Sequence, residues 1–220
     1  MTVHTDLDSL KKAAAVKAVE FVRDGMVVDE RARNRYHATI TAEGERLGRL
    51  VDNVLELSRL EKGNRPMQVQ IGSPRPAVEE VLAMLAPHAA AQGFALDLEA
   101  DTDLPAVRYD RDALVQVLVN LVDNSLKFAR DAERRRIGIA LRADGLGVRL
   151  TVRDHGPGVP EADLRRIFEP FYRGERELTR RTKGTGIGLT LARGLIARMG
   201  GALRAVNAEG GGLLVEIRLA

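Results

Sequence analysis

An aspartate at the end of a predicted strand is the first candidate for chemistry in this chain. Residues 148–154 alternate between apolar and polar positions, as a half-buried strand does, and Gly156 and Gly158 then mark a turn. A carboxylate held there at Asp154 can accept a charge-assisted hydrogen bond from a donor such as the exocyclic amine of adenine. Glycines beside it would let a flat ring approach the backbone. The same residues also fit a hairpin turn with a solvated aspartate.

A second glycine cluster precedes an apolar-periodic segment. Gly184, Gly186 and Gly188 lead into residues 187–199, which have helical spacing and end before a Gly-Gly pair. A glycine-rich loop that opens a helix offers backbone N–H groups and the positive end of the helix dipole to a phosphate. Such a loop can also be a simple connector.

The two clusters are separated by an aromatic segment and a polar run. We expect residues 174–183 to form a mobile lid, with Phe168 and Phe171 anchoring its base in apolar surface. Arg173 or Lys183 would then be available to a phosphate tail. A disordered basic loop is the alternative interpretation.

Two asparagines four residues apart form the third part. Residues 111–129 have the apolar face of an amphipathic helix, and Asn120 and Asn124 lie one turn apart on a common side of it. Amide oxygens are hard ligands that suit a magnesium ion bridging substrate phosphates, and Lys127 lies a turn further on. An asparagine pair on a helix can equally be surface decoration.

The order of these parts resembles that of a known family. N-L-V-D-N-S-L-K-F, D-H-G-P-G, F-E-P-F-Y-R and G-T-G-I-G-L are similar to the N, first glycine, F and second glycine boxes of sensor histidine kinases. Gyrase, chaperone and mismatch-repair relatives share the glycine boxes but typically carry Glu where Asn120 stands. The resemblance implies binding of ATP and Mg²⁺, with Asn120 and Asn124 as metal ligands. The implied nucleotide-binding residues are Asn120, Asn124, Lys127, Asp154, Gly156, Gly158, Phe168, Phe171, Tyr172, Arg173, Lys183, Gly184, Thr185, Gly186, Gly188 and Leu189.

Residues 1–63 are predicted to form two helices with apolar stripes that nothing in their own segment covers. Two such hairpins packed as a four-helix bundle would bury these stripes, so we expect a homodimer. The end of the second helix, L-V-D-N-V-L-E-L-S-R-L-E-K-G, resembles the dimerisation helix of histidine kinases. A hinge at residues 63–66 would lead into a catalytic domain at residues 66–220.

The phosphoacceptor segment departs from the family pattern. The resemblance implies a motif like H-E-L-R-T-P-L about 53 residues before Ser58, where His4 stands in the context H-T-D-L-D-S-L. A count from V-E-F-V-R-D-G instead places Asp6 near the acceptor position. A histidine nucleophile needs a carboxylate to hold the proton on its other ring nitrogen, and only Asp8 shares a helical face with His4. His4 is therefore the candidate phosphoacceptor. The alternative interpretation is that His4 is only an exposed histidine in a divergent N-terminus.

Composition and the absence of long apolar runs restrict the partners. The 34 basic and 31 acidic residues are spread along the chain, and the net charge is only +3. The sequence therefore shows no basic cluster of the kind that binds nucleic acid. Cysteine is absent, which excludes disulfides and thiolate metal sites. No apolar run of about 18 residues occurs, so we expect no membrane segment. We expect a cytoplasmic protein, or a cytoplasmic fragment of a membrane-bound sensor whose sensor domain lies elsewhere.

The predicted fold is α+β. Strands and helices mix without regular βαβ alternation, which predicts an α/β sandwich with a mixed sheet on one side and three helices on the other, after the N-terminal hairpin. The resemblance implies an ATP-dependent protein-histidine kinase core that phosphorylates a histidine on the dimerisation helix and then a response-regulator aspartate. Alternatives are a nucleotide-binding pseudokinase or scaffold without a competent acceptor, an ATP-hydrolysing machine and an anti-sigma-type serine kinase.

Overall fold

The computed structural model describes residues 30–173 and 185–220. The chain forms two compact units, Met1–Leu55 and Glu56–Ala220. The helix α2 (Glu30–Glu61) supplies the described part of the first unit, and its last residues belong to the second. Among the described helices, none is long and apolar enough to cross a membrane. The first predicted helix lies outside the described residues, so the hairpin and its four-helix bundle stay a prediction.

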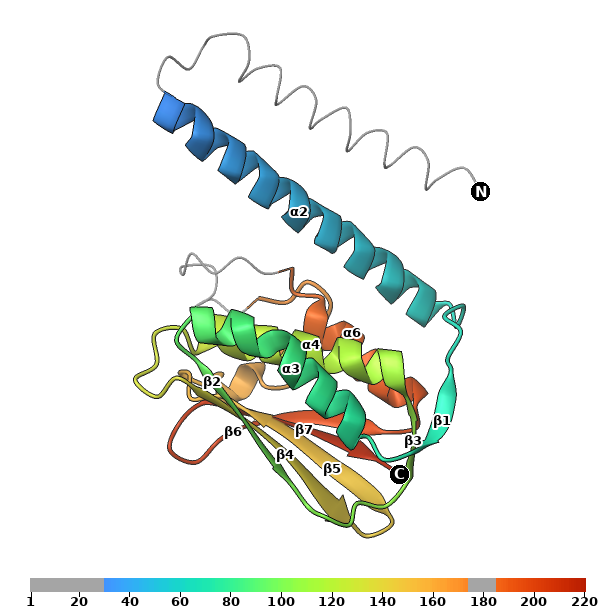
Figure 1. Cartoon of the computed structure of the whole chain (residues 1–220). Coiled ribbons are helices and arrows are strands. Elements are labelled where there is room, and N and C mark those ends of the chain that lie inside the picture. The colour runs from blue at the N-terminus through green and yellow to red at the C-terminus, as the bar shows by residue number, and fades with distance from the viewer. Residues whose placement is uncertain (1–29, 174–184) are drawn as a thin grey trace. The chain divides into compact units, whose positions relative to one another are not determined.

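The second unit is a two-layer sandwich of a mixed sheet and helices (Figure 1). The sheet has the order β2-β4-β5-β7-β6, in which β2 and β4 are parallel and the other neighbours antiparallel. Its strands are β2 (Ala95–Ala100), β4 (Arg136–Asp144), β5 (Gly147–Arg153), β7 (Leu213–Leu219) and β6 (Ala202–Asn207). The helices α3 (Arg75–Ala91), α4 (Arg111–Phe128) and α6 (Gly188–Arg198) cover one face. This architecture confirms the predicted mixed sheet with helices on one side.

Smaller elements connect these layers. The strand β1 (Val69–Gly72) pairs antiparallel with β3 (Val107–Asp110) in a second sheet. Two short 3-10 helices, η1 (Glu161–Asp163) and η2 (Arg166–Phe168), follow β5 and were not predicted. Asp110 caps α4, because its Oδ1 accepts a hydrogen bond of 2.9 Å from the Ala113 N–H.

The core holds α4 in a fixed orientation against the sheet. Leu114, Leu118 and Leu121, on the apolar face of α4, are each at most 1% exposed. Leu150 of β5 stands opposite Ile217 of β7 in the antiparallel register, and both side chains are fully buried. Burial of such large side chains contributes about 1.5–3 kcal/mol each. Because the apolar face of α4 is fixed by this packing, the direction of its polar face is fixed too.

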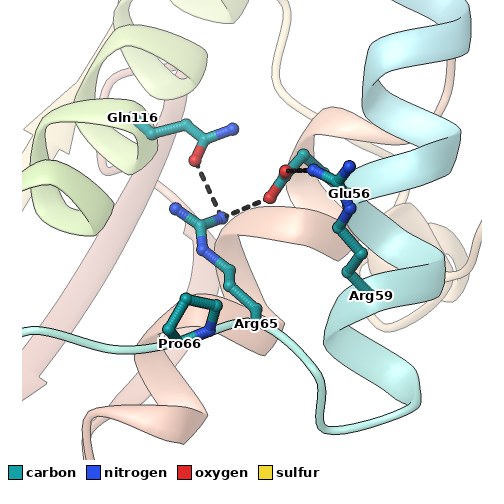
Figure 2. Close-up of a pocket in the computed structure, with 5 residues that line it drawn as sticks. All are labelled: Glu56, Arg59, Arg65, Pro66 and Gln116. Carbon is teal, nitrogen blue, oxygen red and sulfur yellow. Dashed lines mark hydrogen bonds and ion pairs between the residues drawn. The ribbon is translucent and has the colours of Figure 1, made fainter.

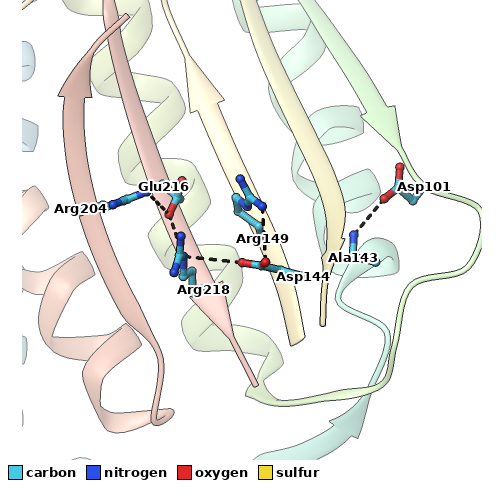
Figure 3. Close-up of polar contacts among 7 residues, drawn as sticks. All are labelled: Asp101, Ala143, Asp144, Arg149, Arg204, Glu216 and Arg218. Atoms are coloured by element: carbon cyan, nitrogen blue, oxygen red, sulfur yellow. Dashed lines mark hydrogen bonds and ion pairs between the residues drawn. The ribbon is translucent and has the colours of Figure 1, made fainter. Parts of the chain in front are cut away.

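A network of charged side chains lies on the sheet face opposite the helices (Figure 3). It is called the charge ladder here and consists of Asp144, Arg149, Arg204, Glu216 and Arg218. Glu216 of β7 accepts from Arg204 of β6 and from Arg218, both at 2.9 Å, while Asp144 lies 3.4 Å from Arg149 and 3.7 Å from Arg218. Burial raises the pKa of Glu216, but the hydrogen bonds and positive charges of both arginines outweigh burial and hold that pKa below its usual range. The ladder therefore ties the edge strand β6 to the middle of the sheet.

Arg65, in the segment between α2 and β1, makes polar contacts with both α2 and α4 (Figure 2). Arg65 Nη1 donates to Glu56 Oε2 at 2.9 Å and to Gln116 Oε1 of α4 at 3.0 Å, beside an open pocket of about 450 Å³. Gly63 has a positive φ of 70° just after the end of α2, as a chain reversal there requires. Glu56 also pairs with Arg59. The end of α2 is thereby joined to α4 within the second unit.

Candidate functional site

Asp154 lies directly after β5 and is 5% exposed. Its Oδ1 accepts from the Gly156 N–H at 2.8 Å and from the Leu213 N–H at 3.1 Å, and its own N–H donates to the Leu213 carbonyl at 3.0 Å. Both side-chain hydrogen bonds fall on Oδ1, which leaves Oδ2 without one within residues 30–173 and 185–220. The turn and β7 therefore hold this carboxylate with one acceptor oxygen still available to a ligand.

The electrostatic state of Asp154 follows from its burial. Burial raises the pKa of this carboxyl, and the N–H groups of Gly156 and Leu213, with the nearby charges of His155 and Arg153, offset only part of that rise. The ionised form is thus poorly solvated. A ligand donor that reaches Oδ2 would supply the stabilisation that water cannot, which makes the resulting hydrogen bond a strong one.

The loop after Asp154 lies against the end of α4. A Cβ built on Gly156 would be 3.0 Å from the Phe128 carbonyl oxygen, closer than a side chain tolerates without movement. Gly158 has a positive φ of 68°, which favours glycine. Gly156 therefore allows a close approach of the loop to α4, and Gly158 allows the turn that follows.

The amide pair of α4 faces the beginning of α6. A Cβ built on Gly188, the first residue of α6, would lie 3.7 Å from Asn120 Cγ and 4.0 Å from Asn124 Nδ2. Asn120 Nδ2 is buried and has no hydrogen-bond partner among the described residues. A buried NH₂ group in this state calls for a hydrogen-bond acceptor from outside the chain, such as water or a ligand oxygen. Lys127, a turn further on, lies with its Nζ 4.2 Å from the centroid of the Phe128 ring.

These amides suit a magnesium ion that is shared with phosphates. In the part of the chain that the structure describes, no group of three or more histidine, aspartate or glutamate side chains could hold a metal ion alone. Mg²⁺ commonly keeps several waters and takes only one or two protein ligands together with substrate phosphates. Asn120 and Asn124 fit such a shared site, because each offers a neutral, hard amide oxygen.

The aromatic segment is joined to α6 by main-chain contacts. The Phe168 carbonyl accepts from Thr190 Oγ1 at 2.9 Å and from Arg193 Nη2 at 3.3 Å, and the Phe168 ring is 4% exposed. The Phe171 N–H donates to the Gly186 carbonyl at 2.9 Å. A Cβ built on Gly186 would lie 2.8 Å from the Phe171 carbonyl carbon, so no side chain fits there. The aromatic segment and the start of α6 thus form one packed unit.

One expectation about this segment was wrong. Phe168 is buried as predicted, but the Phe171 ring is 61% exposed and does not anchor the segment in apolar surface. The reason is local, because Phe171 has a positive φ of 62° and is held through its backbone. That conformation directs the chain toward Gly186 and leaves the Phe171 side chain in solvent.

The other predicted residues fall around the same elements. Tyr172 lies beside Arg166, whose guanidinium is 4.3 Å from its ring centroid, and a hydrogen bond with Asp163 and burial raise the pKa of Tyr172. Arg173 is half-buried after it. Thr185 Oγ1 accepts from the Ile187 N–H at 3.3 Å, and Leu189 packs against the core. His4, Lys183 and Gly184 lie outside the described residues.

Direct contacts connect the predicted motifs through α4. A Cβ on Gly156 would meet its last residue, Phe128, and a Cβ on Gly188 would meet Asn124 and Asn120, which lie one and two turns before Phe128. Gly186, just before α6, contacts Phe171. A carboxylate, an amide pair and a helix beginning are therefore neighbours along one helix. This arrangement can hold an elongated ligand with a hydrogen-bond donor at one end and negative charge at the other.

The sequence interpretation missed several residues that hold this site. Thr190 and Arg193 grip the Phe168 carbonyl, Leu213 fixes Asp154, and Asn207 holds the backbone at Val159. Thr190 and Arg193 lie three residues apart on α6, which a helical wheel could have indicated. Asn207 and Leu213 are distant from the loop in sequence, and no local signal points to them.

Comparison with known families gives a match over the C-terminal half of the chain. A model described as histidine kinase-, DNA gyrase B- and HSP90-like ATPase matches residues 109–220. That span is just over half of the chain and includes the asparagine, aromatic and glycine motifs of the site. The sensor histidine kinase AruS of Pseudomonas aeruginosa is 37% identical over 196 residues, which cover 87% of this chain and 20% of AruS. The chain therefore spans about a fifth of the length of that relative.

Solved structures have the same fold. Full-length ShkA in complex with AMPPNP superposes with a TM-score of 0.72 at 25% identity, covering 98% of this chain and 45% of ShkA. The histidine kinase ThkA, in complex with the response regulator protein TrrA, gives a TM-score of 0.71 at 22% identity and covers 95% of this chain and 57% of ThkA.

Proposed function

The chain belongs to the histidine kinase-, DNA gyrase B- and HSP90-like ATPase family as a histidine kinase ATP-binding core, and from this premise we propose that it binds Mg-ATP and phosphorylates a histidine. The histidine would lie on the dimerisation helix, and an aspartate of a response regulator would then take the phosphoryl group. Two similar structures support this proposal. ShkA was solved with the nucleotide AMPPNP, which relates to the first step, and ThkA was solved with a response regulator, which relates to the second. A homodimer through residues 1–63, catalysis by residues 66–220 and an upstream sensor outside this chain complete the proposal.

The observation that carries the proposal is the order of contacts along α4. Gly156, whose N–H donates to Asp154, lies against its last residue, and Asn120 and Asn124 lie beside the first residue of α6. Adenine would donate its exocyclic amine to Asp154 Oδ2, and the phosphates would extend toward the asparagines and the helix beginning at Gly188. The separation of the two ends along one rigid helix suits an extended nucleotide.

The remaining motif residues would contact the phosphates or shape the loop around them. Lys127 and Arg173, with Lys183 from the segment before α6, would pair with phosphate oxygens. The phosphate loop would be shaped by Gly184, Thr185, Gly186 and Leu189. The aromatic segment that packs beside this loop would contribute Phe168, Phe171 and Tyr172. A magnesium ion held by Asn120 and Asn124 would neutralise charge on the phosphates. The amides contribute positioning, because they orient the phosphates for in-line attack.

The transfer itself requires an imidazole nucleophile. A ring nitrogen attacks the γ-phosphorus, the bond from that phosphorus to the β–γ bridging oxygen breaks, and ADP leaves with the electron pair. The proton on the other ring nitrogen is stabilised by a neighbouring carboxylate. His4, with Asp8 one helical turn on, is the candidate in this chain, and Asp6 marks the alternative alignment of the acceptor position.

Labelling with γ-labelled ATP tests this proposal. We expect protein-bound label that is lost in acid and stable in alkali, as phosphohistidine is, and we expect His4→Ala to remove it. His37→Ala is the matched control, because it removes an exposed histidine from α2. Label that survives His4→Ala would contradict the acceptor assignment alone. Nucleotide binding without any label would contradict kinase activity of this chain.

A pseudokinase or scaffold is the second candidate function. The acceptor segment H-T-D-L-D-S-L favours it, because it lacks both the adjacent acid and the proline of the family motif. Adding a separate dimerisation domain that carries an intact acceptor motif distinguishes the two. A labelled added domain would show that the catalytic residues work and only the acceptor is lost.

A further inference from the structure

We propose that Asn207 is a positioning residue for nucleotide binding. It holds the loop formed by residues 154–159, here called the 154–159 loop, so that Asp154 meets the adenine ring at a fixed distance. This inference rests on the proposed function for the identity of the ligand. The contacts that carry it involve Asn207, Gly158, Val159 and the turn between β6 and β7.

Asn207 binds both polar groups of one backbone residue. Its Oδ1 accepts from the Val159 N–H at 2.9 Å, and its Nδ2 donates to the Val159 carbonyl at 2.7 Å. A side-chain amide has an acceptor and donors side by side, so it can pair with a backbone N–H and C=O as a neighbouring strand does. The last residue of β6 thereby fixes the far end of the 154–159 loop.

The amide also explains a glycine of the motif. A Cβ built on Gly158 would lie 2.6 Å from Asn207 Oδ1, and Gly158 has a φ of 68°. The Asn207 amide therefore occupies the space where a side chain of residue 158 would begin. Gly158 is required in this chain for its backbone conformation and for the close approach of that amide.

The same turn holds the near end of the loop. Leu213 exchanges two hydrogen bonds with Asp154, one with its main-chain N–H at 3.0 Å and one with its carboxylate at 3.1 Å. Arg153 donates to the Glu209 carbonyl at 2.6 Å, and a Cβ on Gly212 would collide with the Asp154 carbonyl oxygen. Residues 207–213 thus grip the loop at Asp154 and again at Val159.

Holding both ends limits how far the loop can move. A carboxylate that binds one donor loses affinity when its distance and direction fluctuate, because hydrogen bonds weaken steeply with angle. With Asn207 removed, the 154–159 loop would stay attached at Asp154 but would be free at Val159. The cost would appear in nucleotide binding and not in the core, since Asn207 itself is exposed.

A thermodynamic cycle tests this role. Asn207→Ala should weaken ATP affinity about three- to tenfold, as measured by titration calorimetry, which is less than the full effect of two hydrogen bonds because both are lost in the free protein as well. In an Asp154→Asn background the same change should have little effect, because the contact that Asn207 positions is already lost. Glu209→Ala is the matched control, since this turn residue acts through its carbonyl. Equal losses in both backgrounds would overturn the positioning role and indicate general destabilisation.

Hydrogen exchange in the nucleotide-free protein gives a second, independent test. Asn207→Ala should accelerate exchange at the Val159 amide and in the 154–159 loop, while exchange in β5 and α4 stays slow. Unchanged exchange there would refute the clamp whatever the ligand is. Loss of ATP binding in Asp154→Asn with normal binding in Asn207→Ala would overturn this inference alone. Failure of the wild-type protein to bind any adenine nucleotide would overturn the proposed function.

Discussion

Replacing Asp154 by asparagine should separate nucleotide recognition from folding. The side chain is 5% exposed, and its Oδ1 already accepts from the N–H groups of Gly156 and Leu213. An asparagine can keep both of these hydrogen bonds with its amide oxygen, because it has nearly the same shape. The atom that changes is Oδ2, which becomes an NH₂ group facing the adenine amine.

The expected loss of affinity can be estimated from that single atom. A hydrogen bond to a charged group contributes about 1.5–3 kcal/mol, and here it would be replaced by two donors facing each other. Each 1.36 kcal/mol corresponds to about a tenfold change, so ATP should bind about ten- to hundredfold more weakly. Inosine triphosphate, which carries an acceptor in place of the exocyclic amine, should lose nothing and could gain from the new donor.

The stability of the same variant should not fall at neutral pH. Burial raises the pKa of Asp154 in the folded protein, so the folded state holds this proton more tightly than the unfolded state. Stability from this group therefore decreases as the pH rises from the ordinary aspartate range through the raised pKa. Above that window the buried charge is a penalty, which asparagine removes. Urea denaturation at pH 7 should find the variant at least as stable as the wild type.

Calorimetric titration of both nucleotides against both proteins decides the matter. Equal weakening for ATP and inosine triphosphate would contradict recognition of the adenine amine by Asp154. Unchanged ATP affinity would refute the assignment entirely. In the wild type, ATP affinity should also fall as the pH is lowered through the raised pKa of Asp154, because the carboxylate is then protonated. The variant should not show this fall, since it has no carboxyl group at position 154. Titration of the nucleotide phosphates affects both proteins equally and cancels in the comparison.

Three further changes test the metal site, the helix cap and the charge ladder. Asn124→Ala should lower the gain in ATP affinity that Mg²⁺ provides while leaving binding in EDTA nearly unchanged, and an equal loss in both conditions would argue against a metal ligand. Asp110→Ala should cost about 1–2 kcal/mol in urea denaturation, because it removes the α4 cap and the hydrogen bond that Oδ2 accepts from the Gln68 N–H, with Asp112→Ala as an exposed control. Glu216→Gln should cost about 1 kcal/mol at pH 7, and the difference should shrink as the pH falls through the lowered pKa of Glu216, because its ionised form is then lost in the wild type as well. A difference that stays constant with pH would contradict that explanation.

Local signals account for most of the fold that was predicted. The amphipathic pattern of α4 is a property of contiguous residues, and the predicted helix is confirmed at Arg111–Phe128. The strand β7 (Leu213–Leu219) also has a local signal, because it follows a run of glycines and alternates polar and apolar residues from Val215 onward. The short helices η1 and η2 have no such periodicity, since three residues are too few to produce one.

Contacts between distant segments account for what the sequence did not reveal. Phe171 was expected in apolar surface because it is aromatic, yet its backbone conformation places it in solvent. Asn207 is 48 residues from Val159, and an asparagine at a strand end is usually a turn residue. Only the antiparallel pairing of β6 with β7, and of β7 with β5, brings that amide beside the loop that follows β5.

The helix α4 shows how folding and the site depend on the same residues. Its leucines are buried against the sheet, and the helical repeat then directs Asn120 and Asn124 toward Gly188. A change that rotates α4 by even part of a turn would move both amides away from α6 and shift Phe128 against Gly156. Core substitutions that leave the protein folded should therefore still alter nucleotide affinity. This coupling between core packing and affinity should be most evident in Leu118→Ala, which removes a fully buried side chain one turn from Val122.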